Sequence, residues 1–152
     1  MNHQTRRSFL KASAAASALA VNFVPSRVFG ANDRVRIGVA GINGRGQSHM
    51  GAYLGMKNVE VSHLIDPDSR LFNSRGKRVA DRQGGRMPKC VQDVREALED
   101  KNLDAVSVAT TNHWHSLIGI WACQAGKDAY IEKPISHNVY EGRKLVEAAE
   151  KY

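Results

Sequence analysis

The fold of this chain is decided by residues 35–46, which read Val35-Arg36-Ile37-Gly38-Val39-Ala40-Gly41-Ile42-Asn43-Gly44-Arg45-Gly46. Three β-branched residues alternate along the first half of the stretch, and a glycine cluster ends it. This pattern predicts a short buried strand that leads into a tight turn. Met50, Tyr53 and Leu54 then follow at helical spacing, so we expect a helix directly after the turn.

The order strand, glycine turn, helix is the context in which a dinucleotide-binding fingerprint is found. One glycine makes the turn, a second lets the backbone approach a pyrophosphate, and a third lets the helix pack on the strand. The helix N-terminus then offers free N–H groups and partial positive charge to the phosphates. Asn43 occupies the second glycine's place here, with Gly44 beside it. We therefore expect a variant cofactor-binding turn made by Gly41, Asn43, Gly44, Arg45 and Gly46; the alternative is a glycine-rich turn of another α/β protein.

Residues 1–30 are predicted to precede the fold as a signal peptide and pro-segment. They contain four basic residues and no acidic one, ahead of an apolar run over residues 12–24 that is too short and too polar for a membrane span. The segment Thr5-Arg6-Arg7-Ser8-Phe9-Leu10-Lys11 resembles the twin-arginine export signal. We expect export of the folded protein to the periplasm or the medium, with cleavage after Ala20 or Gly30; the alternative is a disordered basic tail.

The charge of the chain does not call for a nucleic acid partner. The net charge of +7 falls to +3 when the four basic residues of the leader are removed, because 18 basic and 15 acidic residues remain. Cys90 and Cys123 form no CxxC pattern, and folding in a reducing cytoplasm favours two buried thiols. His113 and His115 lack a carboxylate or thiolate that would complete a metal site, so no metal is expected.

Residues 31–152 are predicted to form one α/β domain with a doubly wound, Rossmann-like parallel sheet. Strands are expected over 35–40, 59–65, 89–91, 105–109 and 129–132. Helices are expected after 46, over 68–83, after a capping box of Asp93 and Glu96, over 114–125, and after an N-cap at Asn138 supported by Glu141. Because such a domain usually has six strands, the chain is expected to be truncated before a second domain.

Asp66 ends the second predicted strand, 20 residues after Gly46. An acidic residue at this place accepts hydrogen bonds from the adenosine ribose, and it repels a 2′-phosphate, which favours NAD over NADP. Arg70 keeps NADP open as an alternative. The competing interpretation is structural, because Asp66-Pro67 is also a good helix N-cap followed by proline at the first helical position.

Two further polar segments follow strands of the predicted sheet. Thr110, Asn112 and His115 follow the fourth strand, and Glu132-Lys133-Pro134 follows the fifth. Ligands of open parallel sheets lie beyond the carboxyl ends of the strands, so we expect both segments to face the cofactor. Asn112 and His115 are placed to hydrogen-bond a ribose or the nicotinamide edge.

Taken together, these segments resemble the N-terminal half of a Gfo/Idh/MocA family oxidoreductase, with Glu132-Lys133-Pro134 as the most specific match. The chain departs from the family pattern at Asn43 and at Thr111, where proline is common. The resemblance implies a second α/β domain that shapes the substrate pocket and assists homo-oligomerisation. It also implies that Lys133 lies between nicotinamide and substrate as the catalytic residue, and that Glu132 helps to fix Lys133 and the ribose.

The resemblance leaves three functional hypotheses. The first is an exported NAD(P)-dependent dehydrogenase acting on a sugar or polyol, with no nucleic acid partner and no membrane contact beyond export. The second is a glycosidase resembling the NAD-dependent α-N-acetylgalactosaminidases, in which the cofactor is regenerated in each turnover. The third is a non-catalytic NAD-binding protein. Under either enzyme hypothesis, residues 1–152 alone are expected to hold the nucleotide but to be inactive.

Overall fold

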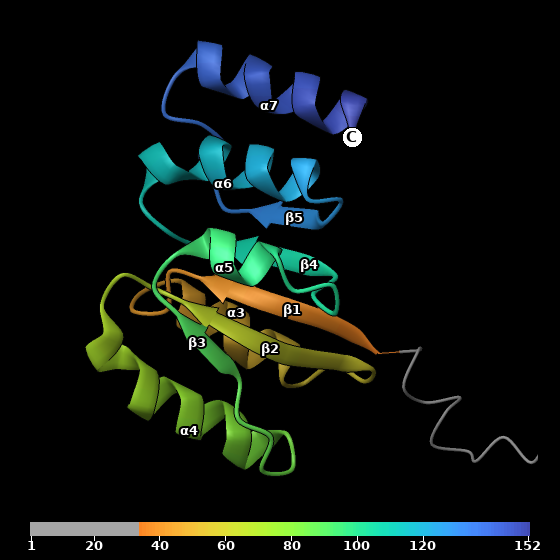
Figure 1. Ribbon diagram of the computed structural model, residues 1–152. Coiled ribbons are helices and arrows are strands. Elements are labelled where there is room, and N and C mark those ends of the chain that lie inside the picture. Colours follow the sequence, from red (N-terminus) through yellow and green to blue (C-terminus); the bar gives the residue numbers. More distant parts are fainter. Residues whose placement is uncertain (1–33) are drawn as a thin grey trace, which may run out of the picture. The chain divides into compact units, whose positions relative to one another are not determined.

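The computed structural model of the protein describes residues 34–152, which form one unit built on a parallel five-stranded sheet (Figure 1). The strands are β1 (Val35–Ala40), β2 (Val59–Ile65), β3 (Lys89–Val91), β4 (Ala105–Val108) and β5 (Asp128–Ile131). Their spatial order is β3-β2-β1-β4-β5, and each neighbouring pair is parallel. The predicted strands and the parallel α/β class are therefore confirmed.

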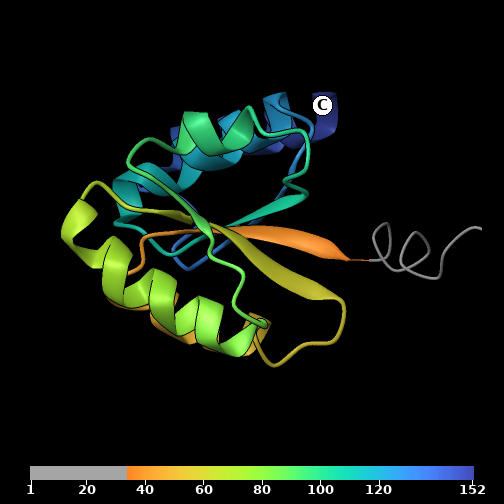
Figure 2. The same ribbon diagram turned by 60° about the horizontal axis from the view of Figure 1, so that its bottom comes forward.

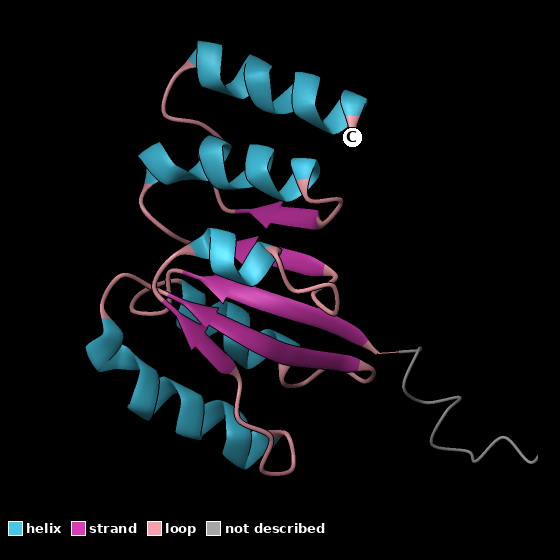
Figure 3. Cartoon of the chain, in the orientation of Figure 1, coloured by secondary structure: helices cyan, strands magenta, loops and turns pink. Residues whose placement is uncertain are grey.

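Helices connect the strands and cover both faces of the sheet (Figures 2 and 3). They are α3 (Gly46–Tyr53), α4 (Phe72–Arg82), α5 (Val94–Leu98), α6 (Asn112–Gln124) and α7 (Val139–Lys151), with a 3₁₀ turn η1 (Ser69–Leu71) before α4. One core cluster joins α3 and α4 to the sheet through residues such as Met50 and Val79. A second cluster joins α5 and α6 to the other face through residues such as Leu98 and Ile118.

The sheet order places a topological switch point between β1 and β4. From β1 the chain moves outward through β2 to β3, and it then crosses back to β4 on the other side of β1. The connections after β1 and after β4 therefore leave the same end of the sheet on opposite faces. This is the place where doubly wound folds bind their ligands. The glycine turn follows β1, and the segment with Thr110 follows β4.

Several local predictions differ from the structure. The helix expected over 68–83 is divided into η1 and α4, and its N-cap is Asp68, whose carboxylate accepts a hydrogen bond from Arg70 N–H. Asp93 is confirmed as the N-cap of α5, but its side chain accepts from Arg95 N–H and not from Glu96 N–H, so the capping-box bond expected with Glu96 is absent. The cap of α7 is confirmed, since Asn138 accepts from Glu141 N–H.

The other differences are small. The fourth and fifth strands end one residue earlier than expected, although Ala109 N–H still bonds to Ala40 and Glu132 N–H to Val108. Cys90 and Cys123 are free thiols, each only partly buried. The predicted leader, residues 1–30, lies outside the described residues. No helix within residues 34–152 has the length and apolar composition needed to cross a membrane.

Candidate functional site

The turn after β1 requires glycine at two positions. Gly41 has a φ of +81°, and a Cβ there would lie 2.6 Å from the Ala109 carbonyl oxygen. A Cβ on Gly46 would collide with the Gly41 carbonyl oxygen, so α3 can begin at this place only with glycine. Gly44 differs, because nothing lies within 4 Å of an added Cβ. Asn43 does not use a left-handed conformation, since among described non-glycine residues only Asn58 has a positive φ.

The N-terminus of α3 is open to an anion. Arg45 is its N-cap residue and makes no side-chain capping hydrogen bond, and the first turn contains no acidic residue. No side chain therefore offsets the positive end of the helix dipole, although the N–H groups of Gln47 and Ser48 already bond to the carbonyl oxygens of Gly44 and Arg45. This open helix end, with bare backbone at Gly44, fits the pyrophosphate of a dinucleotide.

Asp66 connects the end of β2 to the glycine turn. The residue is 8% exposed, Oδ2 accepts from Ile42 N–H at 2.9 Å, and Oδ1 accepts from Asp68 N–H at 2.9 Å. The predicted helix-cap geometry is therefore wrong, because Asp66 closes a short turn and Asp68 caps the following 3₁₀ helix. Each carboxylate oxygen keeps a second lone pair for another donor. Arg70 makes a bidentate ion pair with Asp68.

A cavity of about 580 Å³ opens over the carboxyl ends of β1, β2 and β4. Of the predicted residues, it is lined by Gly41, Asn43, Gly44, Asp66 and Thr110. Its opposite wall comes from residues that the sequence did not single out as functional, including Arg95 and Trp121, and from Trp114. The Arg95 guanidinium lies 5.5 Å from the centre of the Trp121 ring. Hydrogen bonds from Arg95 lower the pKa of Asp93 to about 2.

A second cavity of about 420 Å³ adjoins the first, because both are lined by Ala109 and Thr110. Its other walls are all residues predicted for the site: Arg45, Asn112, His115, Glu132 and Lys133. The structure therefore brings together side chains from three connections that follow β1, β4 and β5. Gly46 lines neither cavity and lies beneath the turn.

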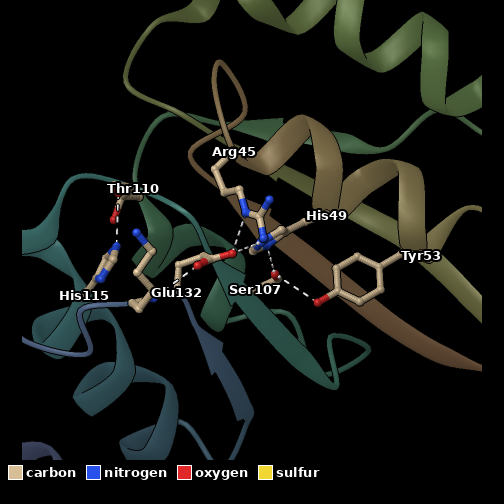
Figure 4. Close-up of polar contacts among 8 residues, drawn as sticks. Arg45, His49, Tyr53, Ser107, Thr110, His115 and Glu132 are labelled. Carbon is tan, nitrogen blue, oxygen red and sulfur yellow. Dashed lines mark hydrogen bonds and ion pairs between the residues drawn. The ribbon is translucent and has the colours of Figure 1, made fainter.

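Glu132 is the centre of a polar network in the second cavity (Figure 4). Its Oε1 accepts hydrogen bonds from Arg45 Nε at 2.6 Å and from His49 Nε2 at 2.9 Å. Its Oε2 accepts from the backbone N–H of Lys133 at 3.2 Å. The hydrogen bond from Arg45, followed by that from His49, lowers the pKa of Glu132 to about 2. Glu132 is therefore a carboxylate at any working pH.

The sequence interpretation missed the inner half of this network. His49 Nδ1 lies 2.8 Å from Ser107 Oγ, and the Tyr53 hydroxyl donates to Ser107 Oγ at 3.0 Å. His49 and Tyr53 are four residues apart on α3, which places them on one helix face. A histidine on the same helical face as the apolar residues was the available signal, but nothing in the sequence pairs it with Glu132.

His115 fixes the loop that follows β5. It is 1% exposed, Nδ1 lies 2.7 Å from the Pro134 carbonyl oxygen, and Nε2 lies 3.1 Å from that of Thr110. Ser116 Oγ also donates to the Ile135 carbonyl at 3.2 Å. The start of α6 thus holds the segment that carries Lys133. Among residues 34–152 no three His, Cys, Asp or Glu side chains are grouped to hold a metal ion.

The chain is similar in sequence and in fold to several known proteins. A relative named Glycosyl hydrolase family 109 protein 2, from Shewanella sp. (strain ANA-3), is 30% identical and aligns with 95% of this chain but 37% of its own length. A probable dehydrogenase from Thermotoga maritima has a TM-score of 0.70 at 26% identity, covering 77% of this chain and 33% of that one. Levoglucosan dehydrogenase, in complex with NADH and levoglucosan, has a TM-score of 0.66 at 25% identity, covering 78% and 32%. The chain spans about a third of the length of the proteins it matches.

Two sequence families match directly. Residues 3–21 match the twin-arginine translocation signal, which indicates export by that route. Residues 35–152 match the oxidoreductase family with an NAD-binding Rossmann fold that is named Gfo/Idh/MocA. With its glycine turn, its two adjoining cavities and this match over most of its length, the chain belongs to the Gfo/Idh/MocA family of NAD-binding oxidoreductases.

Proposed function

We propose that this chain is the nucleotide-binding part of an exported, NAD-dependent oxidoreductase that acts on a hydroxyl group of a sugar or polyol. The observation that carries the proposal is the second cavity, where Lys133 and Glu132 lie beside Asn112 and adjoin the larger cavity with Asp66. The arrangement gives an extended cofactor two neighbouring compartments at the switch point of the sheet.

Each compartment supplies different chemistry to the cofactor. In the larger one, the backbone of the glycine turn at Gly41, Asn43 and Gly44, just before α3, would hold the pyrophosphate, and Asp66 would accept hydrogen bonds from the adenosine ribose. In the smaller one, Thr110, Asn112 and Glu132 would orient the nicotinamide ribose and ring, with His115 holding the loops around them. The negative charge of Asp66 favours NAD over NADP, because a 2′-phosphate beside it would be repelled.

Lys133 is the residue proposed to meet the substrate. Bound in this site, NAD would supply the acceptor for a hydride from the substrate carbon. The Lys133 amine would take the proton from the hydroxyl on that carbon, so that the hydroxyl becomes a carbonyl group. Glu132 accepts a hydrogen bond from the backbone N–H of Lys133, and both residues line the second cavity. Proton transfer of this kind contributes typically 10²–10⁴-fold to a rate.

The test is a substitution of Lys133 in the complete protein. We expect Lys133→Ala to lower turnover by about 10²–10⁴-fold while NAD affinity changes by only a few-fold, since the other contacts to the cofactor remain. Lys101→Ala is the matched control, because Lys101 is exposed in the turn before β4, at the amino end of that strand. Full turnover in Lys133→Ala would remove the lysine from the mechanism.

A second activity is favoured by the name of the relative at 30% identity, Glycosyl hydrolase family 109 protein 2. In an NAD-dependent glycosidase the same site would oxidise a sugar carbon transiently, and the hydride would return within each turnover. Release of a nitrophenol from a nitrophenyl glycoside without added NAD would identify this activity. Accumulation of NADH with a free sugar would instead identify a dehydrogenase.

A further inference from the structure

The Glu132 carboxylate is bonded by one exposed side chain and by one buried side chain. Arg45 reaches it from the solvent side, and the Arg45 side chain is 65% exposed. His49 reaches it from the interior, and its side chain is 8% exposed. Exposed ion pairs contribute little and exchange readily with solvent. The buried histidine is therefore the contact that can fix the Glu132 carboxylate in one orientation.

With a neutral His49 ring, one set of hydrogen-bonding roles satisfies every member of the network. An ionised carboxylate only accepts, so His49 Nε2 must carry a hydrogen to bond Glu132. In a neutral ring Nδ1 is then an acceptor, and its partner at 2.8 Å is the Ser107 hydroxyl. Ser107 Oγ in turn accepts from the Tyr53 hydroxyl at 3.0 Å. Donors thus run in one direction, from Tyr53 through Ser107 and His49 to Glu132.

This chain of donors links three elements that surround the second cavity. His49 and Tyr53 lie on α3 after the glycine turn, Ser107 lies on β4, and Glu132 follows β5. Ser107 is fully buried, so the inner end of the chain is fixed by the sheet itself. Figure 4 shows the succession of contacts from Tyr53 to Glu132. A buried network with every member satisfied is rigid and specifies one arrangement.

We propose that His49 is a positioning residue that sets the Glu132 carboxylate and, through the contact of that carboxylate with Lys133 N–H, the place of the Lys133 side chain. The proposal rests on the role of Lys133 under the proposed function. Ser107 and Tyr53 belong to the same network, since Ser107 Oγ holds the Nδ1 side of the His49 ring and the Tyr53 hydroxyl holds Ser107. His49 itself acts only through Glu132, whereas Lys133 meets the substrate.

The experiment compares variants of the complete protein in two measurements that do not need turnover. The first is the nitrogen NMR spectrum of His49, in which we expect the Nε2–H tautomer. The second is an NMR titration of the Glu132 carboxyl carbon. The pKa of this group is lowered to about 2, partly by His49. Arg45, the largest cause of the low pKa, remains in His49→Leu, so only the part of the shift that comes from His49 should be lost and the pKa should rise partway toward its ordinary value. In His49→Gln, which keeps an N–H near the same place, the pKa should stay low.

Turnover provides the third measurement. We expect His49→Leu to lower kcat on the order of 10- to 100-fold, as for a small displacement of a reacting group, with KM nearly unchanged and with partial recovery in His49→Gln. His63→Leu is the matched control, because His63 is equally buried but lies on β2 and contacts Ser62 and Asp100. It should change stability while leaving kcat and the Glu132 titration as they are.

The outcomes separate this proposal from the proposed function. If Lys133→Ala is inactive while His49→Leu folds and keeps both kcat and the low Glu132 pKa, the positioning role is overturned. If His49 carries its hydrogen on Nδ1, the proposed direction of the network is overturned. If Lys133→Ala is active but Glu132 titrates as expected, the link between His49 and Glu132 stands and the role assigned to Lys133 fails.

Discussion

Single side chains in this protein serve structure and chemistry together, and Asp66 is the clearest example. Its two oxygens hold the N–H groups of Ile42 and Asp68, and the same carboxylate lines the larger cavity. The sequence offers both a helix-cap interpretation and a ribose-binding interpretation of Asp66. The structure moves the cap to Asp68 but leaves a structural role for Asp66, so the two contributions must be separated by experiment.

We predict that Asp66→Ala will lower the free energy of unfolding by about 1–3 kcal/mol, because the buried Ile42 N–H loses its acceptor. NAD binding should weaken by about 1.5–3 kcal/mol, and affinity for NADP should improve relative to NAD. Thermal unfolding and titration with each nucleotide measure these effects. Asp68→Ala is the control, because it removes the cap of η1 without altering the cavity lining. Lost stability with an unchanged NAD to NADP ratio would leave Asp66 with a structural role only.

In the turn between β1 and α3, two neighbouring glycines are required for different reasons, one for packing and one for ligand binding. Gly46 is needed inside the protein, because a side chain there would meet the backbone of Gly41. Gly44 has open space around it and lines the larger cavity. Glycine is therefore needed at this position for the approach of a ligand and not for packing within the protein. The fingerprint assigns these roles by position in the sequence. The packing of α3 against β1 gives the physical reason for the difference.

We predict that Gly46→Ala will destabilise the domain by about 1–3 kcal/mol or more, since overpacking forces the backbone to shift. Gly44→Ala should leave stability unchanged or raise it by about 0.4–1 kcal/mol, because it restricts the unfolded chain. Gly44→Ala should weaken NAD binding while the protein keeps its normal stability, whereas any loss of NAD binding in Gly46→Ala should accompany a loss of stability. Chemical denaturation and NAD titration of the two variants make the comparison, and equal loss of stability in both would contradict it.

The chain as a whole combines an export signal with a cofactor-binding domain. The twin-arginine match covers residues 3–21, and the NAD-binding family match begins at residue 35. We propose that the protein folds and takes up NAD in the cytoplasm before it is exported to the periplasm or the medium. A cofactor that is regenerated in each turnover suits a compartment where free NAD is scarce.

We predict that changing Arg6 and Arg7 to lysine will retain the full-length protein in the cytoplasm in a folded state, because the paired arginines are the signal that the export route recognises. Fractionation followed by immunoblotting measures the distribution. Changing Lys11 to arginine, which leaves the pair intact, is the control. An unchanged distribution of the double-lysine protein would overturn the proposed route.

The sequence determined the class of fold because its signals are local. Alternation in β1, the glycine cluster and the apolar stripe of α6 each depend on residues close together in the chain. The family was also readable, since the glycine turn, Asp66 and Glu132-Lys133-Pro134 keep their spacing along the sequence. Even the association of Lys133 with the predicted site followed from one rule about the carboxyl ends of parallel strands.

Tertiary structure alone decided which of these residues touch. Arg45 and Glu132 are 87 positions apart, and His49 and Ser107 are 58 apart, so no local pattern could pair them. The roles of Trp121 and Arg95 in the wall of the larger cavity likewise depend on how α5 and α6 pack on the sheet. Contacts of this kind arise when separate elements bury their apolar faces against one sheet. The sequence therefore predicts the helices and strands, whereas their packing determines which polar side chains bond to each other.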